Sequence, residues 1–280
     1  MNSNIVELFT ISTLHDTHDW SSVIENQRCK YLKRKCIKTR KSQPSLAIGT
    51  CSIVHAIKNP QRVIICPHRF LERGQIFLDC LHLLTLHEPG YEIHLIPEVE
   101  IPGGTVDYFL VSVNQKRVID FVGIEIQALD TTGTLWSSRQ KFLETTGMNV
   151  GEYSDADTYG INWKMTAKTA LVQLHHKIET LEGLGKHLVL VIQDQLMNYM
   201  VKEFSFEGTH SARLGDAMHF HTYGLFQENS DYRIQLTSRT STDSSGVASL
   251  LGLRKNPNIQ LETITSLLQN KLSDNTLTIF

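Results

Sequence analysis

Several features that would assign the chain to a membrane or to a motor protein are missing from its 280 residues. No apolar run approaches the ~20 residues that a helix needs to span a bilayer. The N-terminus lacks the basic-then-apolar pattern of a secretory signal, so we expect a cytoplasmic protein. The GxxxxGK[ST] loop that cradles the phosphates of ATP is also absent, so ATP-driven translocation is not expected.

An excess of charge of one sign is missing as well. The formal net charge is −2 at pH 7, which argues neither for nor against a nucleic-acid partner. Nucleases concentrate positive charge locally, and residues 28–41 are rich in Lys and Arg and contain no acid. Such a run could be a solvated face, or it could contact DNA phosphates. The run could also be a free tail, but its position between cysteines disfavours that, so we favour DNA contact, with Arg34 and Lys35 as our candidates.

Composition and element order predict an α/β fold. A hydrophobic content of 41% and a charged content of 20% are typical of a globular protein, and the length allows one large domain or two small ones. Periodicity predicts helices over 70–87, 163–181 and 258–271, strands over 91–101, 106–113, 118–129, 186–192, 218–226 and 232–237, and a flexible polar loop over 238–246. This order predicts a mixed central sheet flanked by helices.

Two strands joined by a hairpin turn carry the acids that we expect to be functional. With the turn centred between residues 115 and 116, Asp107 lies opposite residue 124, or within one residue of Glu125. Directly opposed Cβ atoms are about 5 Å apart, so both carboxylates could share one Mg²⁺. Gln127, two residues beyond Glu125, points to the same face.

An ordinary structural role for these acids remains an alternative. Acids occur on half-buried strands whose other face is wet, and Glu125 interrupts an apolar run, where a carboxylate needs a partner. That partner could be a bound cation, or it could be an Arg or Lys. Glu98 or Glu92 on the preceding strand could add a further carboxylate and a second metal, or could simply face solvent; Glu98 is our further catalytic candidate.

The cysteines form the second signal. There are five, and the first four, Cys29, Cys36, Cys51 and Cys66, are spaced C-x6-C-x14-C-x14-C, without the paired C-x2-C knuckles of a zinc ribbon. In a cytoplasmic protein disulfides are disfavoured, and four thiolates around one Zn²⁺ or Fe ion are the natural alternative. Four ordinary buried cysteines remain equally compatible with the spacing. Cys80 falls on the apolar face of a predicted helix and is expected in the core.

These parts together resemble a known enzyme family. The order of acid, hairpin and Glu-x-Gln resembles the PD-(D/E)xK nuclease superfamily, with Gln127 where lysine is usual. The cysteine segment, the hairpin and the stretch NWKMTAK over 162–168 are similar to restriction endonucleases of the NotI type, across residues 29–195.

The resemblance implies a type II restriction endonuclease that hydrolyses duplex DNA and leaves 5′-phosphate ends. It implies Mg²⁺ held by Asp107 and Glu125, a water or phosphate oriented by Gln127, and a structural Cys₄ metal site over residues 1–69, ahead of a nuclease domain over 70–280. A palindromic target implies a homodimer, because protein symmetry mirrors site symmetry. A cognate DNA methyltransferase is expected in the same system.

Further basic residues are candidates for DNA contact. Lys164 and Lys168 lie four positions apart near a predicted helix N-terminus, which suits a phosphate, although a solvated helix face is equally compatible. Arg139 and Arg239 fall in predicted polar loops, where base-reading side chains are found. Two other functions remain open: a repair or recombination nuclease without sequence specificity, and a metal-stapled DNA-binding protein that does not cut.

Overall fold

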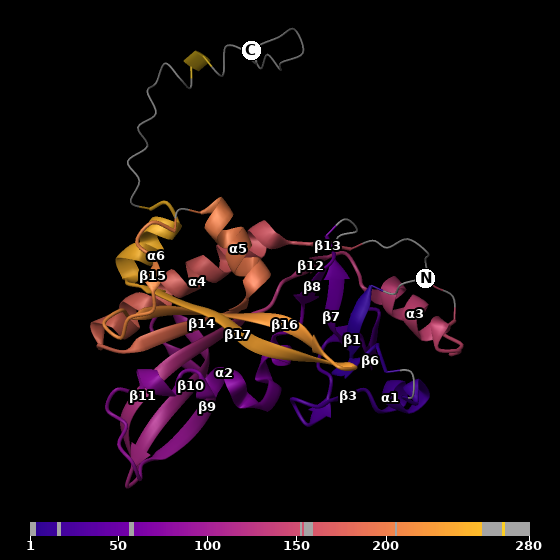
Figure 1. The fold of residues 1–280 in the computed structure, drawn as a ribbon, viewed down its shortest axis with the longest axis horizontal. Coiled ribbons are helices and arrows are strands. Elements are labelled where there is room, and N and C mark those ends of the chain that lie inside the picture. The colour runs from indigo at the N-terminus through magenta and orange to yellow at the C-terminus, as the bar shows by residue number, and fades with distance from the viewer. Residues whose placement is uncertain are drawn as a thin grey trace.

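The protein is built around one large mixed sheet, as the computed structural model shows for residues 4–15, 18–55, 59–151, 153, 159–204, 206–253 and 265–266 (Figure 1). The strands of this sheet follow the order β15-β17-β16-β14-β11-β10-β9. They are β9 (Glu92–Ile101), β10 (Gly104–Asn114), β11 (Arg117–Gln127), β14 (His187–Gln193), β15 (His210–Ser211), β16 (Met218–Glu228) and β17 (Asp231–Thr242). The predicted α/β class with a mixed central sheet is confirmed.

The strand β14 lies at the centre of the sheet and is buried along its whole length. It pairs in parallel with β11 on one side and with β16 on the other. Its residues alternate between two apolar cores: Leu188, Leu190 and Ile192 belong to one, and Val189 and Val191 to the other. A continuous run of Val, Ile and Leu is typical of a strand covered on both faces.

Helices cover the two faces of the sheet. On one face lie α4 (Trp163–Gly183), α5 (Asp194–Glu203) and α6 (Ser244–Leu250), which gather above the strands in Figure 1. Against the other pack η1 (Pro67–Gly74), α2 (Gln75–Leu78) and η2 (Leu81–Leu83). Within the described ranges, no helix is both long enough and apolar enough to cross a membrane.

Two predicted elements are wrong in the structure. The continuous helix expected over 70–87 is broken into η1, α2 and η2, because Arg73 and Gly74 adopt left-handed backbone angles, with φ of 53° and 65°. The loop expected over 238–246 is instead the end of β17, which pairs with β16 as far as Thr242, followed by the start of α6. There Asp243 caps the helix by accepting a hydrogen bond from Gly246 N at 2.7 Å. The helix predicted over 258–271 falls outside the described residues, apart from 265–266.

The N-terminal part of the chain builds a separate four-stranded sheet of order β2-β1-β7-β8. Its strands are β1 (Ile5–Leu8), β2 (Ile11–Ser12), β7 (Thr50–His55) and β8 (Gln61–Ile64). Between β2 and β7 lie α1 (Trp20–Asn26), β3 (Arg28–Cys29), β4 (Arg34–Lys35), β5 (Thr39–Arg40) and β6 (Gln43–Ala47). The remaining elements, β12 (Thr131–Thr132), α3 (Trp136–Thr145) and β13 (Gly160–Ile161), come later in the chain, between β11 and α4. The domain boundary predicted between 69 and 70 falls inside η1 and stays a prediction.

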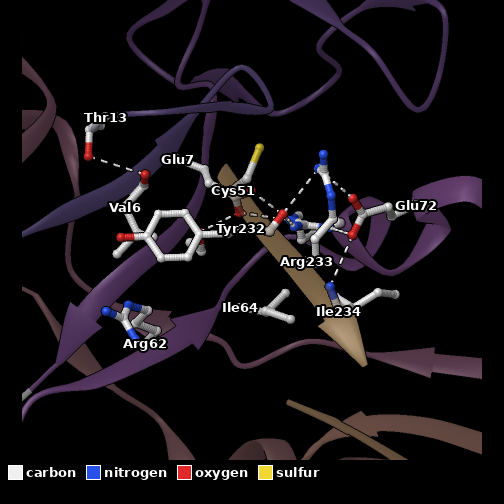
Figure 2. Close-up of polar contacts among 12 residues, drawn as sticks. Val6, Glu7, Thr13, Cys51, Arg62, Ile64, Glu72, Tyr232, Arg233 and Ile234 are labelled. Atoms are coloured by element: carbon white, nitrogen blue, oxygen red, sulfur yellow. Dashed lines mark hydrogen bonds and ion pairs between the residues drawn. The ribbon is translucent and has the colours of Figure 1, made fainter. Parts of the chain in front are cut away.

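A buried ion-pair network joins this N-terminal sheet to the large one. We call Glu7, Arg69, Glu72 and Arg233 the linking network; Figure 2 labels Glu7, Glu72 and Arg233 within it. Arg69 Nε donates to Glu7 on β1 at 2.8 Å, and Arg69 Nη1 donates to Glu72 at 2.9 Å. Arg233 on β17 reaches the other oxygen of Glu72 at 3.0 Å. The network thereby ties β1 and η1 to β17.

Candidate active site and cysteine pocket

Three acids lie in register across three neighbouring strands. The β10–β11 pairing sets Tyr108 opposite Ile124, and continuing that register places Asp107 opposite Glu125. This is one residue away from the mirror position 124, because the register shifts between Ser112 and Val113. The β9–β10 pairing sets Tyr108 opposite Pro97 and Val106 opposite Val99, which places Glu98 opposite Asp107 on its other side. We call Glu98, Asp107 and Glu125 the acid row.

An open pocket of about 150 Å³ lies at two members of the acid row. Its walls come from β9, β10, β11 and the start of η1, and they comprise Pro67, His68, Pro97, Glu98, Asp107, Tyr108 and Ile126. One oxygen of Asp107 accepts a hydrogen bond from Ile126 N at 2.8 Å, which orients the carboxylate across the hairpin. The pocket therefore offers oxygen ligands next to solvent-accessible space.

Glu125, the third acid, is buried and paired with a lysine. Its carboxylate is 2.6 Å from Nζ of Lys177 on α4, in a pair whose side chains are 11% and 6% exposed. Burial raises the pKa of Glu125 to about 7; the Lys177 hydrogen bond lowers it, and the nearby Asp107 charge raises it further. Of the two partners that sequence reasoning allowed, the structure shows the lysine, whose position 52 residues away was not predicted.

Gln127 lies two residues after Glu125 on β11. Its amide Nε2 donates to the carbonyl of Ala128 at 2.6 Å. Together with Glu125 it borders a small gap under α4 that Gln173 and Leu174 also line. Gln127 thus shares its surroundings with the acid row, and it brings no charge to them.

The four cysteines predicted to form a metal site line one small pocket. This cysteine pocket has a volume of about 20 Å³ and is bordered by Cys29, Cys36, Cys51 and Cys66, which come from β3, β7 and the segments after β4 and β8. Cys80 lies elsewhere, in the apolar core as expected, and is fully buried.

The thiols in this pocket interact with one another. A hydrogen bond between the Cys51 and Cys66 thiols, helped by Lys38, lowers the pKa of Cys66 to about 7, although burial opposes it. The same hydrogen bond raises the pKa of Cys51. His68, two residues after Cys66, lines both the cysteine pocket and the acid pocket, so the two sites adjoin. Sequence reasoning missed His68.

Both sites carry donors that suit the ions predicted for them. Carboxylate oxygens suit Mg²⁺, and four sulfurs suit Zn²⁺ or Fe. Across the described residues, however, no three His, Cys, Asp or Glu side chains already converge as in a filled metal site. The metal-binding roles of these residues therefore stay predictions.

The predicted DNA-contacting residues are distributed over several elements. Arg34 and Lys35 are exposed on β4, and Lys164 and Lys168 are exposed in the first turns of α4. The polar loop expected around Arg239 is wrong, whereas the short helical pattern that the sequence shows over 138–144 is confirmed as part of α3. Arg139 lies in α3, is 3% exposed, and donates from Nε to Ile48 O at 3.0 Å. Arg239 lies in β17 and donates to Asp79 O at 3.2 Å.

A row of acids beside an open pocket offers oxygen ligands of the kind that hold a divalent ion, and such an ion can activate a phosphate for hydrolysis. The family model described as restriction endonuclease NotI matches residues 25–218, which span both the cysteine pocket and the acid row. The chain belongs to the NotI restriction endonuclease family, and its class is therefore that of a site-specific deoxyribonuclease. A search of curated proteins found no match.

Proposed function

We propose that the protein is a Mg²⁺-dependent type II restriction endonuclease that cleaves duplex DNA at a short palindromic site. The observation that carries the proposal is the acid row, which sets Glu98, Asp107 and Glu125 on three adjacent strands. The open pocket beside it gives a phosphate access to two of these carboxylates. Membership of a restriction endonuclease family supports DNA as the substrate.

Asp107 and Glu125 would hold Mg²⁺, and Glu98 could contribute to a second ion. Bound Mg²⁺ supplies a Lewis acid that polarises the scissile phosphate and lowers the pKa of a water. The hydrogen bond from Ile126 N fixes one Asp107 oxygen and leaves the other for the ion or the water. Gln127 would orient the attacking water or the phosphate through its amide. The products would be a 5′-phosphate and a 3′-hydroxyl, as in the PD-(D/E)xK superfamily.

Cys29, Cys36, Cys51 and Cys66 would hold a structural Zn²⁺ or Fe ion in the cysteine pocket. Cys29 lies on the two-residue strand β3 and Cys36 follows the two-residue strand β4, so a bound metal would stabilise this segment. Metal analysis of the purified protein tests this, with Cys51→Ser as the variant and Cys80→Ala as the matched control. We expect one metal ion per chain in the wild type and in Cys80→Ala, and its loss in Cys51→Ser. Equal metal content in all three would contradict the site.

DNA would lie against the exposed basic residues that adjoin the acid pocket. Arg34 and Lys35 on β4 are exposed, and the Arg34 charge acts on His68, which borders the pocket. A palindromic site requires two copies related by a twofold axis, so we propose a homodimer that acts in the cytoplasm. A methyltransferase of matching specificity would protect the host DNA.

A digest of plasmid DNA with the purified protein and Mg²⁺ tests the proposal. Discrete fragments whose ends carry 5′-phosphates are the expected result. A smear would instead indicate a nuclease without sequence specificity. No cleavage with retained DNA binding would indicate a non-cleaving DNA-binding protein. End-sequencing of discrete fragments would then give the recognition site and the stagger.

A further inference from the structure

Lys177 is a buried cation within the candidate active site. Its side chain is 6% exposed, and its ammonium lies 2.6 Å from the Glu125 carboxylate. Its neighbours on α4, Leu174, Ile178 and Leu181, are buried and apolar. Lysine is almost never fully buried unless it is paired, so this position places one specific charge against the acid row.

The backbone on the opposite side is shaped to admit α4 at this point. Gly103 and Gly104, in the turn between β9 and β10, have φ of 99° and 128°. A Cβ on Gly103 would lie 2.2 Å from the carbonyl oxygen of His176, and one on Gly104 would lie 3.3 Å from Cε of Lys177. Thr180 Oγ1 also donates to Pro102 O at 2.9 Å. Lys177 is therefore positioned beside Glu125 by α4, which carries it, and by the β9–β10 turn, which packs closely against α4 at this point.

The acid row carries more negative charge than its paired partner balances. Glu125 has the Lys177 ammonium beside it, and in the part of the chain that the structure describes no Lys, Arg or His forms an ion pair with Glu98 or Asp107. On the side of Glu125 away from Asp107, β14 presents the apolar Leu190. The surplus negative charge suits a divalent ion, and Lys177 is the positive charge that the protein itself supplies.

Gln127 cannot fill that role. Its amide is uncharged and donates to the carbonyl of Ala128. We propose that Lys177 is a positioning residue of the metal centre: its ammonium holds the Glu125 carboxylate in place beside Asp107 and supplies the positive charge that Gln127 lacks. This inference rests on the proposed Mg²⁺-dependent cleavage and adds to it a residue from outside the hairpin.

Removal of Lys177 should affect the cleavage rate and the metal affinity to different degrees. An ammonium beside a ligand orients the carboxylate but also repels a metal ion, so its effects on metal affinity oppose each other. Its effect on charge that develops in the transition state has no such opposing part. Removal of Lys177 should therefore reduce the cleavage rate at saturating metal far more than it weakens metal binding.

The test compares Lys177→Ala with Lys186→Ala. Lys186 forms a similar partly buried pair with Asp120, which lies on β11 like Glu125 but at its other end. We would measure the single-turnover cleavage rate at saturating Mg²⁺, the Mn²⁺ affinity and electron paramagnetic resonance spectrum of the DNA-free protein, and thermal unfolding. Lys177→Ala should cut about 10²-fold more slowly, the loss typical of one removed electrostatic donor. Added propylammonium, which replaces the deleted atoms, should restore part of the rate.

Lys186→Ala should lose stability but keep the wild-type rate and Mn²⁺ spectrum, whereas Lys177→Ala should change the spectrum because the Glu125 ligand is no longer held. If Lys177→Ala loses stability yet cuts at the wild-type rate with an unchanged spectrum, the lysine is only structural and the inference is overturned. A rate that rises would overturn it too. Absence of cleavage by the wild-type protein would instead overturn the proposed function, and the inference with it.

Discussion

Two groups of charged side chains in this molecule are built differently. In the linking network, the two arginines Arg69 and Arg233 balance the two carboxylates Glu7 and Glu72. In the acid row, among the described residues, only Glu125 of the three carboxylates forms an ion pair, with the ammonium of Lys177. At the centre of the linking network Arg69 is 1% exposed, although Glu72 and Arg233 at its rim line a pocket of about 190 Å³; in the acid row, Glu98 and Asp107 line an open pocket of about 150 Å³.

This difference distinguishes charged residues that stabilise the fold from charged residues that can bind a ligand. In the linking network the carboxylate of Glu72 also accepts a hydrogen bond from Ile234 N at 3.0 Å, and Arg69 donates a further bond to Tyr232 O at 2.8 Å (Figure 2). Buried ions need such complete pairing. The acid row has an excess of negative charge next to solvent. Because these carboxylates repel one another, a bound cation would stabilise the site. Substitutions in the two groups should therefore affect different properties.

The largest expected effect is on catalysis, from Asp107→Asn. The substitution keeps the shape and the oxygen that can accept from Ile126 N, but removes the charge that would hold Mg²⁺. We expect the single-turnover rate to fall by about 10³-fold or more, because a catalytic metal contributes several kcal/mol to transition-state stabilisation. Binding to DNA in Ca²⁺ and thermal stability should stay near the wild-type values. Cleavage at the wild-type rate would show that the acid row is not the catalytic centre.

The next effect is on stability, from Arg69→Met in the linking network. This change leaves Glu7 and Glu72 buried with fewer partners, and breaking a buried pair by removing one member costs about 3–5 kcal/mol. Denaturant unfolding measures the loss, with Asp107→Asn as the matched comparison. A loss below about 1 kcal/mol would mean that the carboxylates are hydrated or protonated in the variant, and that Arg69 is not their essential partner.

How much of the structure can be predicted from the sequence depends on how far apart along the chain the interacting residues lie. A local hairpin, whose turn length sets the register, predicts the partner of Asp107 to within one residue; the register shift between Ser112 and Val113 then moves it from residue 124 to Glu125. The position of Glu98 opposite Asp107 needs the next turn as well, and Glu98 itself adopts a left-handed backbone with φ of 54°. Periodicity does not reveal such a conformation, so only the presence of Glu98 on the preceding strand could be predicted.

Contacts between distant segments were beyond sequence reasoning. Lys177 meets Glu125 across 52 residues, because α4 packs over the sheet. One signal could have indicated it: a lysine on the otherwise apolar face formed by Leu174, Ile178 and Leu181. The broken helix after Phe70 was missed for the opposite reason, since its apolar spacing is helical while Arg73 and Gly74 leave the helical conformation. Tertiary packing decided both cases.

A smaller loss of stability is expected at the rim of the linking network, from Arg233→Met. The Arg233 side chain is 22% exposed, and it contacts Glu228 and Asp231 as well as Glu72. Water can replace part of these interactions, so we expect a loss of about 1 kcal/mol in the free energy of unfolding. Raised salt should diminish this loss but not that of Arg69→Met. Equal losses for the two variants would contradict the distinction between rim and centre.

The smallest effect on the free energy of unfolding should come from charged side chains that are exposed on the surface. Lys164 and Lys168 are exposed on the first turns of α4, where they form no part of either group. Their substitution by Ala should leave stability unchanged and weaken DNA binding in a salt-dependent way. For each phosphate that the variant no longer binds, the slope of log K against log salt should become shallower by about 0.9. Binding isotherms with duplex DNA in Ca²⁺ at several salt concentrations measure the slope. An unchanged slope in the double variant would show that DNA does not contact the N-terminus of α4. Arg34 and Lys35 on β4 would then be the remaining exposed candidates for phosphate contact.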